Sequence, residues 1–337
     1  MKFKNLIFVF IVISALFTSC NEDVLDYMGN WVTKGYYMGK ARAEGTSFAI
    51  NNYGYFGMGR NYSDYLKDFW KYDPVSNSWT QVADFPGTPR AYGVSISNGK
   101  TGYAGLGYDG KNDLSDMWKY DADKDEWSQI DDFPGGKRRY ATAFSIGDDI
   151  YVGCGSDDND EVLYNDFWKY DGKSWSLISQ LTGKKRRKAM AVTLDGKAYV
   201  MGGHQNGPIN DFWSYDPAND KWERLKDLND KDWGIPELPR FNASVYSADG
   251  KIYIVGGNKG SGNDAGCFEW NPNHGKYGLW IQKTSIETGY SREGAGSFVL
   301  NGYGYITGGR NGNTQTSYFD ELYMFQPNAE ANKEDNY

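Results

Sequence analysis

The chain has 337 residues, a formal net charge of −8 at pH 7 and an aromatic content of 17%. Its acidic balance opposes binding to polyanions, so we expect no nucleic-acid partner. The three cysteines are too few and too scattered for a disulfide framework or a thiolate metal cluster. We therefore interpret Cys154 and Cys267 as small buried residues.

The N-terminal stretch MKFKNLIFVFIVISALFTSC places two lysines before an apolar run that is too short to span a bilayer. We interpret residues 1–19 as a signal peptide. The residues before Cys20 resemble a lipobox, although Phe17 stands where leucine is usual. The resemblance implies that Cys20 is lipidated, that residues 20–29 form a tether, and that the protein is exported and anchored to the outer membrane by its lipid. The acidic segment after Cys20 adds the expectation of display at the cell surface. An ordinary secretion signal with an incidental cysteine is the alternative.

A repeated motif follows this segment. The stretch DFWKYDPVSNSW begins at Asp68 and returns in close copies, each ended by a tryptophan: Trp79, Trp127, Trp175 and Trp222. These tryptophans lie 48, 48 and 47 residues apart. Such a period indicates an architecture built from structural repeats.

Each repeat contains four short runs that favour strand. In the second repeat they are AYGVSIS from Ala91, TGYAGLG from Thr101, DMWKYD from Asp116 and EWSQI from Glu126. The runs are rich in aromatic and β-branched residues and are separated by turn formers. Four antiparallel strands per unit, repeated radially, predict an all-β fold, a β-propeller of four-stranded antiparallel blades.

Paired glycines end the second strand of each repeat, in GMG at Gly57, GLG at Gly105, GCG at Gly153 and GG at Gly202, Gly256 and Gly308. With the tyrosine on the next strand and the tryptophan after it, this pattern resembles the kelch repeat of the galactose oxidase central-domain-like superfamily. The resemblance covers residues 30–327 and implies six blades in one domain, with residues 328–337 as a tail. The last repeat lacks a fourth strand. We expect NWVTKG at Asn30 to supply it, since Trp31 matches the tryptophan that begins that strand elsewhere.

An arginine enters the first strand of every repeat, and kelch-like propellers usually bind ligands on this loop face. The set comprises Arg42, Arg90, Arg139, Arg187, Arg240 and Arg292. Guanidinium groups match planar anions in a two-point geometry, so these residues predict a funnel for anions at the mouth of the central channel. The alternative is that each arginine pairs with a carboxylate of the adjacent blade.

Two segments break the repeat on the same face. KKRRK at Lys184 adds local positive charge, and NDKDWGIPELP at Asn229 is a long loop that carries Trp233. Trp233 is expected either to stack on a sugar ring or a peptide side chain, or to act as a lid over the neighbouring blade. The Asp-rich segments lack a calcium-loop pattern, so no metal is expected.

Two enzymatic activities are known among similar propellers, and each needs particular side chains. Copper oxidases of the galactose oxidase type need two histidines at one metal, whereas His204 and His274 are expected at opposite ends of the blades. A resemblance to N-acetylneuraminate epimerase implies two carboxylates beside cations. Glu44 and Glu293 fit as acid and base, because the first and sixth blades adjoin in a closed ring.

No nucleophile, triad or phosphate loop is visible in the sequence. The leading prediction is therefore a non-catalytic lipoprotein without a cofactor. We expect it to bind a glycan or a protein through the arginine face, with His204 and Trp233 among its ligand-binding residues. A sialic-acid mutarotase-like enzyme with Glu44 and Glu293 as catalytic residues, and a structural component of an envelope complex, are the alternatives.

Overall fold

The computed structural model describes residues 27–157, 161–235, 237–287, 289–312 and 314–336. The predicted signal peptide and Cys20 lie outside this range, and their assignment stays a prediction. Among the described residues, no helix is long and apolar enough to cross a membrane.

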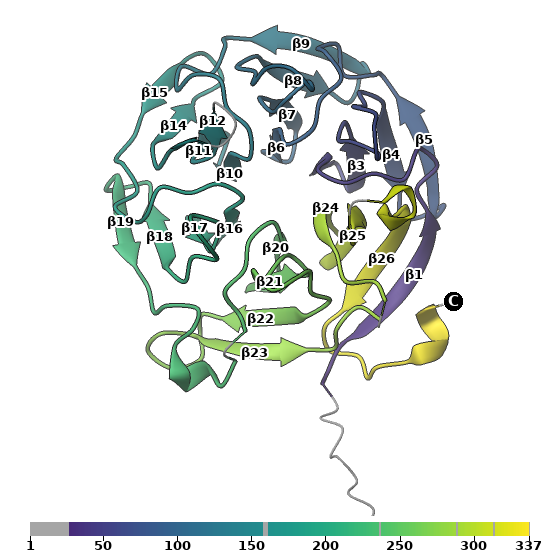
Figure 1. The fold of residues 1–337 in the computed structure, drawn as a ribbon, viewed down its shortest axis with the longest axis vertical. Coiled ribbons are helices and arrows are strands. Elements are labelled where there is room, and N and C mark those ends of the chain that lie inside the picture. Colours follow the sequence, from purple (N-terminus) through teal and green to yellow (C-terminus); the bar gives the residue numbers. More distant parts are fainter. Residues whose placement is uncertain (1–26, 158–160, 236, 288, 313, 337) are drawn as a thin grey trace, which may run out of the picture.

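Six four-stranded antiparallel sheets are arranged around a central axis as the blades of a β-propeller (Figure 1). Blades one to three comprise β2 (Thr46–Ile50), β3 (Tyr53–Gly57), β4 (Phe69–Asp73) and β5 (Ser78–Val82); β6 (Val94–Ser97), β7 (Thr101–Gly105), β8 (Met117–Asp121) and β9 (Glu126–Ile130); and β10 (Thr142–Ile146), β11 (Asp149–Gly153), β14 (Phe167–Tyr170) and β15 (Trp175–Leu177). The predicted all-β class and the blade architecture are confirmed.

Blades four to six complete the circle. They comprise β16 (Met190–Leu194), β17 (Lys197–Met201), β18 (Phe212–Asp216) and β19 (Lys221–Arg224); β20 (Ser244–Ala248), β21 (Lys251–Val255), β22 (Cys267–Asn271) and β23 (Leu279–Lys283); and β24 (Glu293–Leu300), β25 (Tyr303–Arg310), β26 (Glu321–Gln326) and β1 (Asn30–Tyr36).

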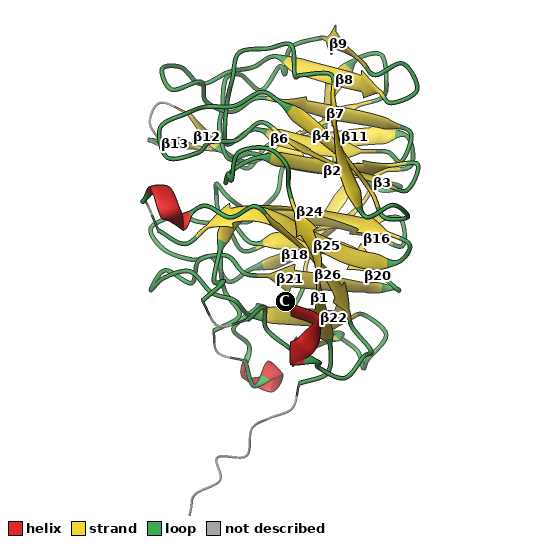
Figure 2. Cartoon of the chain, turned by 90° about the vertical axis from the view of Figure 1, so that its right-hand side faces the viewer, coloured by secondary structure: helices red, strands yellow, loops and turns green. Residues whose placement is uncertain are grey.

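Within the described residues, five small elements lie outside the blade sheets. The strands β12 (Ser156–Asp157) and β13 (Val162–Leu163) form a two-stranded hairpin, and η2 (Lys231–Trp233), η3 (Gln315–Ser317) and η4 (Lys333–Asn336) are 3-10 helices. Seen from the side, the longer connecting loops and the β12–β13 hairpin stand on one side of the disc (Figure 2).

The first and last strands of the chain share one blade. β1 pairs with β26, and Trp31 lies opposite Phe325 in the register. Trp79 lies opposite Tyr72 in the same way in the first blade. The predicted closure of the ring by the N-terminal strand is therefore confirmed.

The burial of the strands follows from their place in the blade. In β7 every residue after Thr101 is buried, because neighbouring blades cover both faces of a second strand, whereas the outer strand β9 is mostly exposed. Aromatic rings fill the space between blades: the Phe48 ring lies 5.2 Å from Tyr55 in its own blade and 6.3 Å from Tyr120 in the next. The repeated aromatic motif is thus the contact between blades.

Candidate functional site

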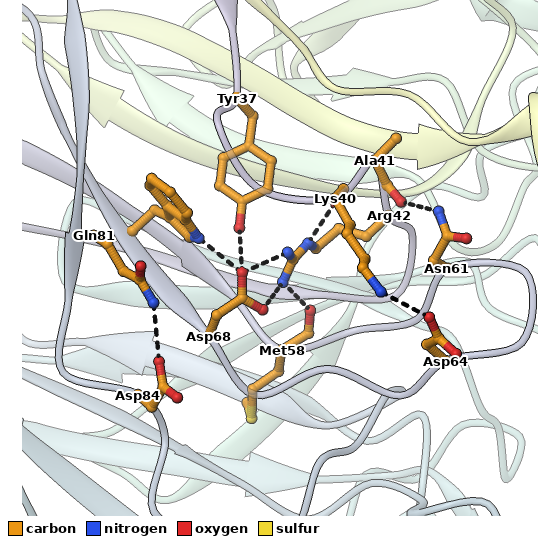
Figure 3. Close-up of polar contacts among 11 residues, drawn as sticks. Tyr37, Lys40, Ala41, Arg42, Met58, Asn61, Asp64, Asp68, Gln81 and Asp84 are labelled. Atoms are coloured by element: carbon orange, nitrogen blue, oxygen red, sulfur yellow. Dashed lines mark hydrogen bonds and ion pairs between the residues drawn. The ribbon is translucent and has the colours of Figure 1, made fainter.

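A buried ion pair lies beneath the loops of the first blade (Figure 3). The Arg42 guanidinium donates to both carboxylate oxygens of Asp68 at 2.7 Å and to the Met58 carbonyl at 3.0 Å. The Trp70 indole also donates to Asp68, at 2.8 Å. Because Arg42 is 0% exposed, this carboxylate anchors the loop before β2 to the start of β4.

A corresponding arginine–carboxylate pair is found in each of the other five blades. The corresponding pairs are Arg90–Asp116, Arg138–Asp166, Arg186–Asp211, Arg240–Asp264 and, more loosely at 3.8 Å, Arg292–Glu321. The expected placement of the arginines at the channel mouth is wrong for Arg42, Arg90, Arg240 and Arg292, which are at most 1% exposed. Their partners lie in their own blade, because the loop before the first strand lies against the loop before the third.

Arg139 and Arg187 have a different position from the other four. In blades three and four the buried anchor is the preceding arginine, and neighbouring side chains of an extended backbone point in opposite directions. The Arg139 side chain therefore points away from the buried anchor position, and its Nε lies 2.5 Å from Asp113 of the preceding blade. The alternative of pairing with an adjacent blade is correct for this residue. The Arg187 guanidinium lies 5.9 Å from the centre of the Tyr140 ring.

Six residues, one from each blade, surround the central channel two positions after the anchor arginine. We call them the ring: Glu44, Tyr92, Tyr140, Lys188, Asn242 and Gly294. Each ring residue donates its backbone N–H to the carbonyl of the ring residue in the preceding blade, at 2.8–3.1 Å, so the hydrogen bonds close a circle. All six have φ between 55° and 64°. Left-handed backbone at five non-glycine residues is costly and is typical of functional sites.

A cavity of about 120 Å³ lies inside the ring. A second circle surrounds it, which we call the rim, made of residue pairs that face each other between the first and second strands of each blade. The pairs are Ala43–Arg60, Ala91–Tyr108, Arg139–Ser156, Arg187–His204, Phe241–Asn258 and Glu293–Arg310. Ring and rim together form the funnel.

Two carboxylates meet on one side of the funnel. The Asn242 side-chain amide donates to Glu44 at 2.8 Å and to Glu293 at 3.2 Å, and Arg310 donates to Glu293 at 3.0 Å. Burial raises the pKa of the Glu44 carboxyl; Lys188 opposes this and Glu293 adds to it. The predicted proximity of Glu44 and Glu293 is thus observed.

Another side of the funnel combines Lys188 and Arg187 with aromatic rings. The Lys188 ammonium lies 4.5 Å from the centre of the Tyr140 ring and 5.7 Å from that of Phe241. The His204 ring contacts Phe241 edge-on at 4.8 Å. Burial lowers the pKa of His204, and Arg187 and Lys188 lower it further, which favours the neutral imidazole. This side offers positive charge next to apolar ring faces.

The long loop of the fourth repeat does not present its aromatic residue to solvent. Trp233 lies in η2, is 8% exposed, and donates its indole N–H to the Asp227 carbonyl at 2.7 Å. The Trp233 indole packs in the core between blades four and five. Its position matches the lid that was the alternative to stacking on a ligand.

The two histidines lie at opposite ends of the blades, as expected. His204 follows β17, whereas His274 lies in the turn between β22 and β23. Within the described part of the chain, no group of three or more His, Cys, Asp or Glu side chains could hold a metal ion.

Tyr92, Tyr140 and Asn242 were not found from the sequence, whereas Lys188 lies in the KKRRK segment that the sequence singled out as local positive charge. All four occupy one repeat position, two residues after the anchor, where the blades differ in residue type. A residue position that varies inside a regular repeat was the signal that could have found them.

Comparison with known proteins agrees with this architecture. A family described as the KLHDC2/KLHL20/DRC7 Kelch-repeats domain matches residues 142–333, and the Kelch motif matches residues 54–86. A Kelch repeat and BTB domain-containing protein 1 of cowpox virus (strain Brighton Red) is 39% identical over 64 residues, which is 18% of this chain and 10% of that protein. The solved structure titled "Structure of YjhT" has a TM-score of 0.71 at 15% identity, covering 86% of this chain and 96% of that one.

Proposed function

The chain belongs to the kelch-repeat domain family, and from that premise we propose that it binds a carboxylate-bearing ligand in the funnel without altering it chemically. The ligand presents its carboxylate either as an acidic sugar or as an acidic group of a protein. The fold itself does not select between these, because propellers serve many functions.

The observation that carries this proposal is the charge of the funnel. On a chain whose net charge is −8, ring and rim hold the cations Arg60, Arg139, Arg187, Lys188 and Arg310 against Glu44 and Glu293. The cations stay in excess when Asp113, the partner of Arg139, is added to the carboxylates. A concave positive surface on an acidic protein concentrates anions locally. The funnel is thus the surface at which an anionic ligand gains the most favourable electrostatic binding energy.

The dimensions of the funnel suggest how such a ligand lies. The inner cavity of about 120 Å³ admits one small group, such as a carboxylate, next to Lys188. Tyr140, Phe241 and His204 then face the body of the ligand with apolar ring surfaces. A sugar ring, with one polar edge and apolar C–H faces, suits this combination.

We place this activity at the cell envelope. The apolar run before Cys20, with the lipobox-like residues around it, supports export and lipid anchoring. A propeller held at the outer membrane by its N-terminus would present its funnel to molecules outside the cytoplasm.

The test is thermal and urea unfolding of the chain without residues 1–19 in the presence of N-acetylneuraminate, glucuronate, neutral N-acetylglucosamine and a poly-glutamate peptide. A ligand at about one hundred times its dissociation constant raises the unfolding free energy by about 2.7 kcal/mol. We expect stabilisation by an acidic sugar and not by the neutral one, lost in Lys188→Gln. Lys184→Gln is the matched control, since it removes an exposed cation four residues earlier.

Stabilisation by the peptide alone would assign the funnel to a protein partner. No stabilisation by any carboxylate-bearing compound, or equal loss in both lysine variants, would overturn the proposal.

A second candidate function is sugar mutarotation of the N-acetylneuraminate epimerase kind, and the shared Asn242 amide between Glu44 and Glu293 favours it. In this reaction Glu293 takes the proton of the anomeric hydroxyl while the ring C–O bond breaks, and protonated Glu44 gives its proton to the ring oxygen. Closure on the other face of the carbonyl reverses both transfers.

Exchange between the N-acetylneuraminate anomers, followed by NMR, separates the two functions. A mutarotase accelerates exchange and loses this in both Glu44→Gln and Glu293→Gln. Binding with exchange at the buffer rate supports the non-catalytic role.

A further inference from the structure

A second and larger cavity, of about 660 Å³, lies between the strands of blade four and the β22–β23 turn of blade five. Figure 1 shows this turn at lower left, next to η2, with which β23 is in contact. The cavity shares no lining residue with the inner cavity of the funnel. Its volume lies within the range of small-molecule sites, roughly 300–1,000 Å³.

The floor of the cavity exists because blade four departs from the repeat at Ser214. In the first three blades the tyrosine of the second strand lies opposite a lysine: Tyr55–Lys71, Tyr103–Lys119 and Tyr151–Lys169. In blade four Tyr199 lies opposite Ser214. A short hydroxyl side chain replaces a long one, so space opens over this part of the sheet.

The roof exists because blade five departs from the repeat as well. The paired Trp270 and Trp280 are ten positions apart in the chain, whereas the corresponding Tyr72 and Trp79 of the first blade are seven positions apart. The longer turn rests on Trp270: a Cβ added to Gly278 would lie 2.4 Å from the indole nitrogen. Gly278, with φ of 73°, therefore permits a close approach that fixes the turn over the cavity.

The lining is positively charged. Lys197, Arg224, Lys226 and Lys276 face a single acid, Glu223. Arg224 pairs with Asp227, and Lys226 pairs with Asp230 and Asp232. Lys197 and Lys276 form no ion pair with any described residue, so two cations remain for an anion from outside.

An exposed aromatic ring completes the wall. Tyr277 is 54% exposed and belongs to the lining. Lys226 and Lys276 lie 5.8 Å and 4.9 Å from the centre of its ring and hold their charges near it. An aromatic face with neighbouring cations suits a ring-shaped ligand that carries negative charge.

We propose that this cavity is a binding site for an anionic saccharide, with Lys197 and Lys276 binding its sulfate or carboxylate groups and Tyr277 stacking on a sugar ring. The two departures from the repeat, at Ser214 and in the β22–β23 turn, make the site together. Neither alone encloses the space. The site is independent of the funnel and of the function proposed for it.

The experiment is isothermal titration of the chain without residues 1–19 with a chondroitin sulfate tetrasaccharide, its desulfated form and neutral chitotetraose. We expect the sulfated sugar to bind, the desulfated uronic sugar to bind more weakly and the neutral sugar not to bind. Lys197→Gln with Lys276→Gln should weaken binding by about tenfold or more, since the two changes remove charge-assisted hydrogen bonds to the anionic groups of the sugar.

Ser214→Lys is the decisive variant, because it restores the residue that three other blades carry and is compatible with the fold. It fills the cavity while adding a positive charge. Occupation of the cavity therefore predicts weaker binding, whereas general attraction to surface cations predicts stronger binding. Lys119→Gln, which removes an exposed lysine from the corresponding position of blade two, is the matched control and should leave affinity unchanged.

Retained or increased affinity in Ser214→Lys would overturn the proposal, as would equal losses in Lys119→Gln and in the double lysine variant. Absence of binding by both anionic tetrasaccharides would also overturn it. Lys188→Gln in the funnel should leave this binding unchanged, so the two sites are distinguished in the same titration.

Discussion

Arg90 and Asp116 form a two-point ion pair beneath the loops of the second blade, with nitrogen–oxygen distances of 2.5 Å and 2.9 Å. The guanidinium also donates to the Leu106 carbonyl at 3.2 Å, and Arg90 is 1% exposed. The pair joins the loop that carries the ring residue Tyr92 to the start of the third strand. The shape of the funnel therefore depends on contacts that no ligand reaches.

Asp116→Asn should destabilise the protein because it leaves a buried guanidinium without its counter-charge. Loss of one partner of a buried pair costs about 3–5 kcal/mol, and the partial exposure of Asp116 favours the lower end, about 3 kcal/mol. Urea unfolding measures the effect. Asp148→Asn is the control, since its partner Lys100 is exposed and such pairs contribute about 1 kcal/mol or less. Equal losses in both variants would show that the buried pair has no special role.

The repeat allowed the architecture to be predicted, because each unit carries the strand pattern and turn residues of one blade. The closing strand was also predictable, since Trp31 occurs where the sixth repeat lacks its tryptophan. The spacing contained one further signal. Arg138 lies 48 residues after Arg90, the same distance as between the tryptophans, and this spacing favours Arg138 over Arg139 as the anchor.

The residues that line the two cavities were harder to predict from the sequence, because each cavity combines residues from separate repeats. Asn242 holds Glu44 and Glu293 together although they are 249 positions apart in the chain. Ser214 and the β22–β23 turn meet only because the blades pack side by side. A single sequence shows where a repeat is broken but does not show which breaks face one another.

Gly105→Ala should disturb the start of the third strand in blade two. An added Cβ would lie 2.2 Å from the Asp116 carbonyl oxygen, so backbone must move, and we expect a loss of about 3 kcal/mol, at the upper end of overpacking effects. Gly99→Ala tests backbone strain alone: φ is 88° there with no atom within 4 Å, and we expect a smaller loss of about 1–2 kcal/mol. Unfolding free energies that rank the two variants in the opposite order would contradict this explanation.

Glu44 should make stability fall as pH rises. Burial raises its pKa in the folded protein, an effect that Glu293 strengthens and that Lys188, Arg310 and the Asn242 amide oppose. The folded state therefore holds the proton more tightly than the unfolded chain, whose glutamate pKa is about 4.3. The stabilisation is complete below that pH and is lost as pH rises through the raised pKa.

The measurement is the difference in unfolding free energy between wild type and Glu44→Gln from pH 3.5 to 7. We expect the wild type to lose stability relative to the variant with increasing pH. Glu126→Gln, at an exposed position of β9, is the control and should show a flat difference. A flat difference for Glu44→Gln, or one of opposite slope, would show that burial does not favour the protonated carboxyl.

Trp31→Ala should weaken the closure of the propeller by its N-terminal strand. Trp31 is 2% exposed, packs against Phe325 with ring centres 4.6 Å apart, and donates its indole N–H to the Thr284 carbonyl of blade five at 2.8 Å. Truncation of a buried tryptophan costs about 3–5 kcal/mol. Tyr36→Ala, in the same strand but 63% exposed, should change stability by about 0.5 kcal/mol or less. A similar small effect in both variants would mean that pairing of β1 with β26, and not the tryptophan, holds the propeller closed.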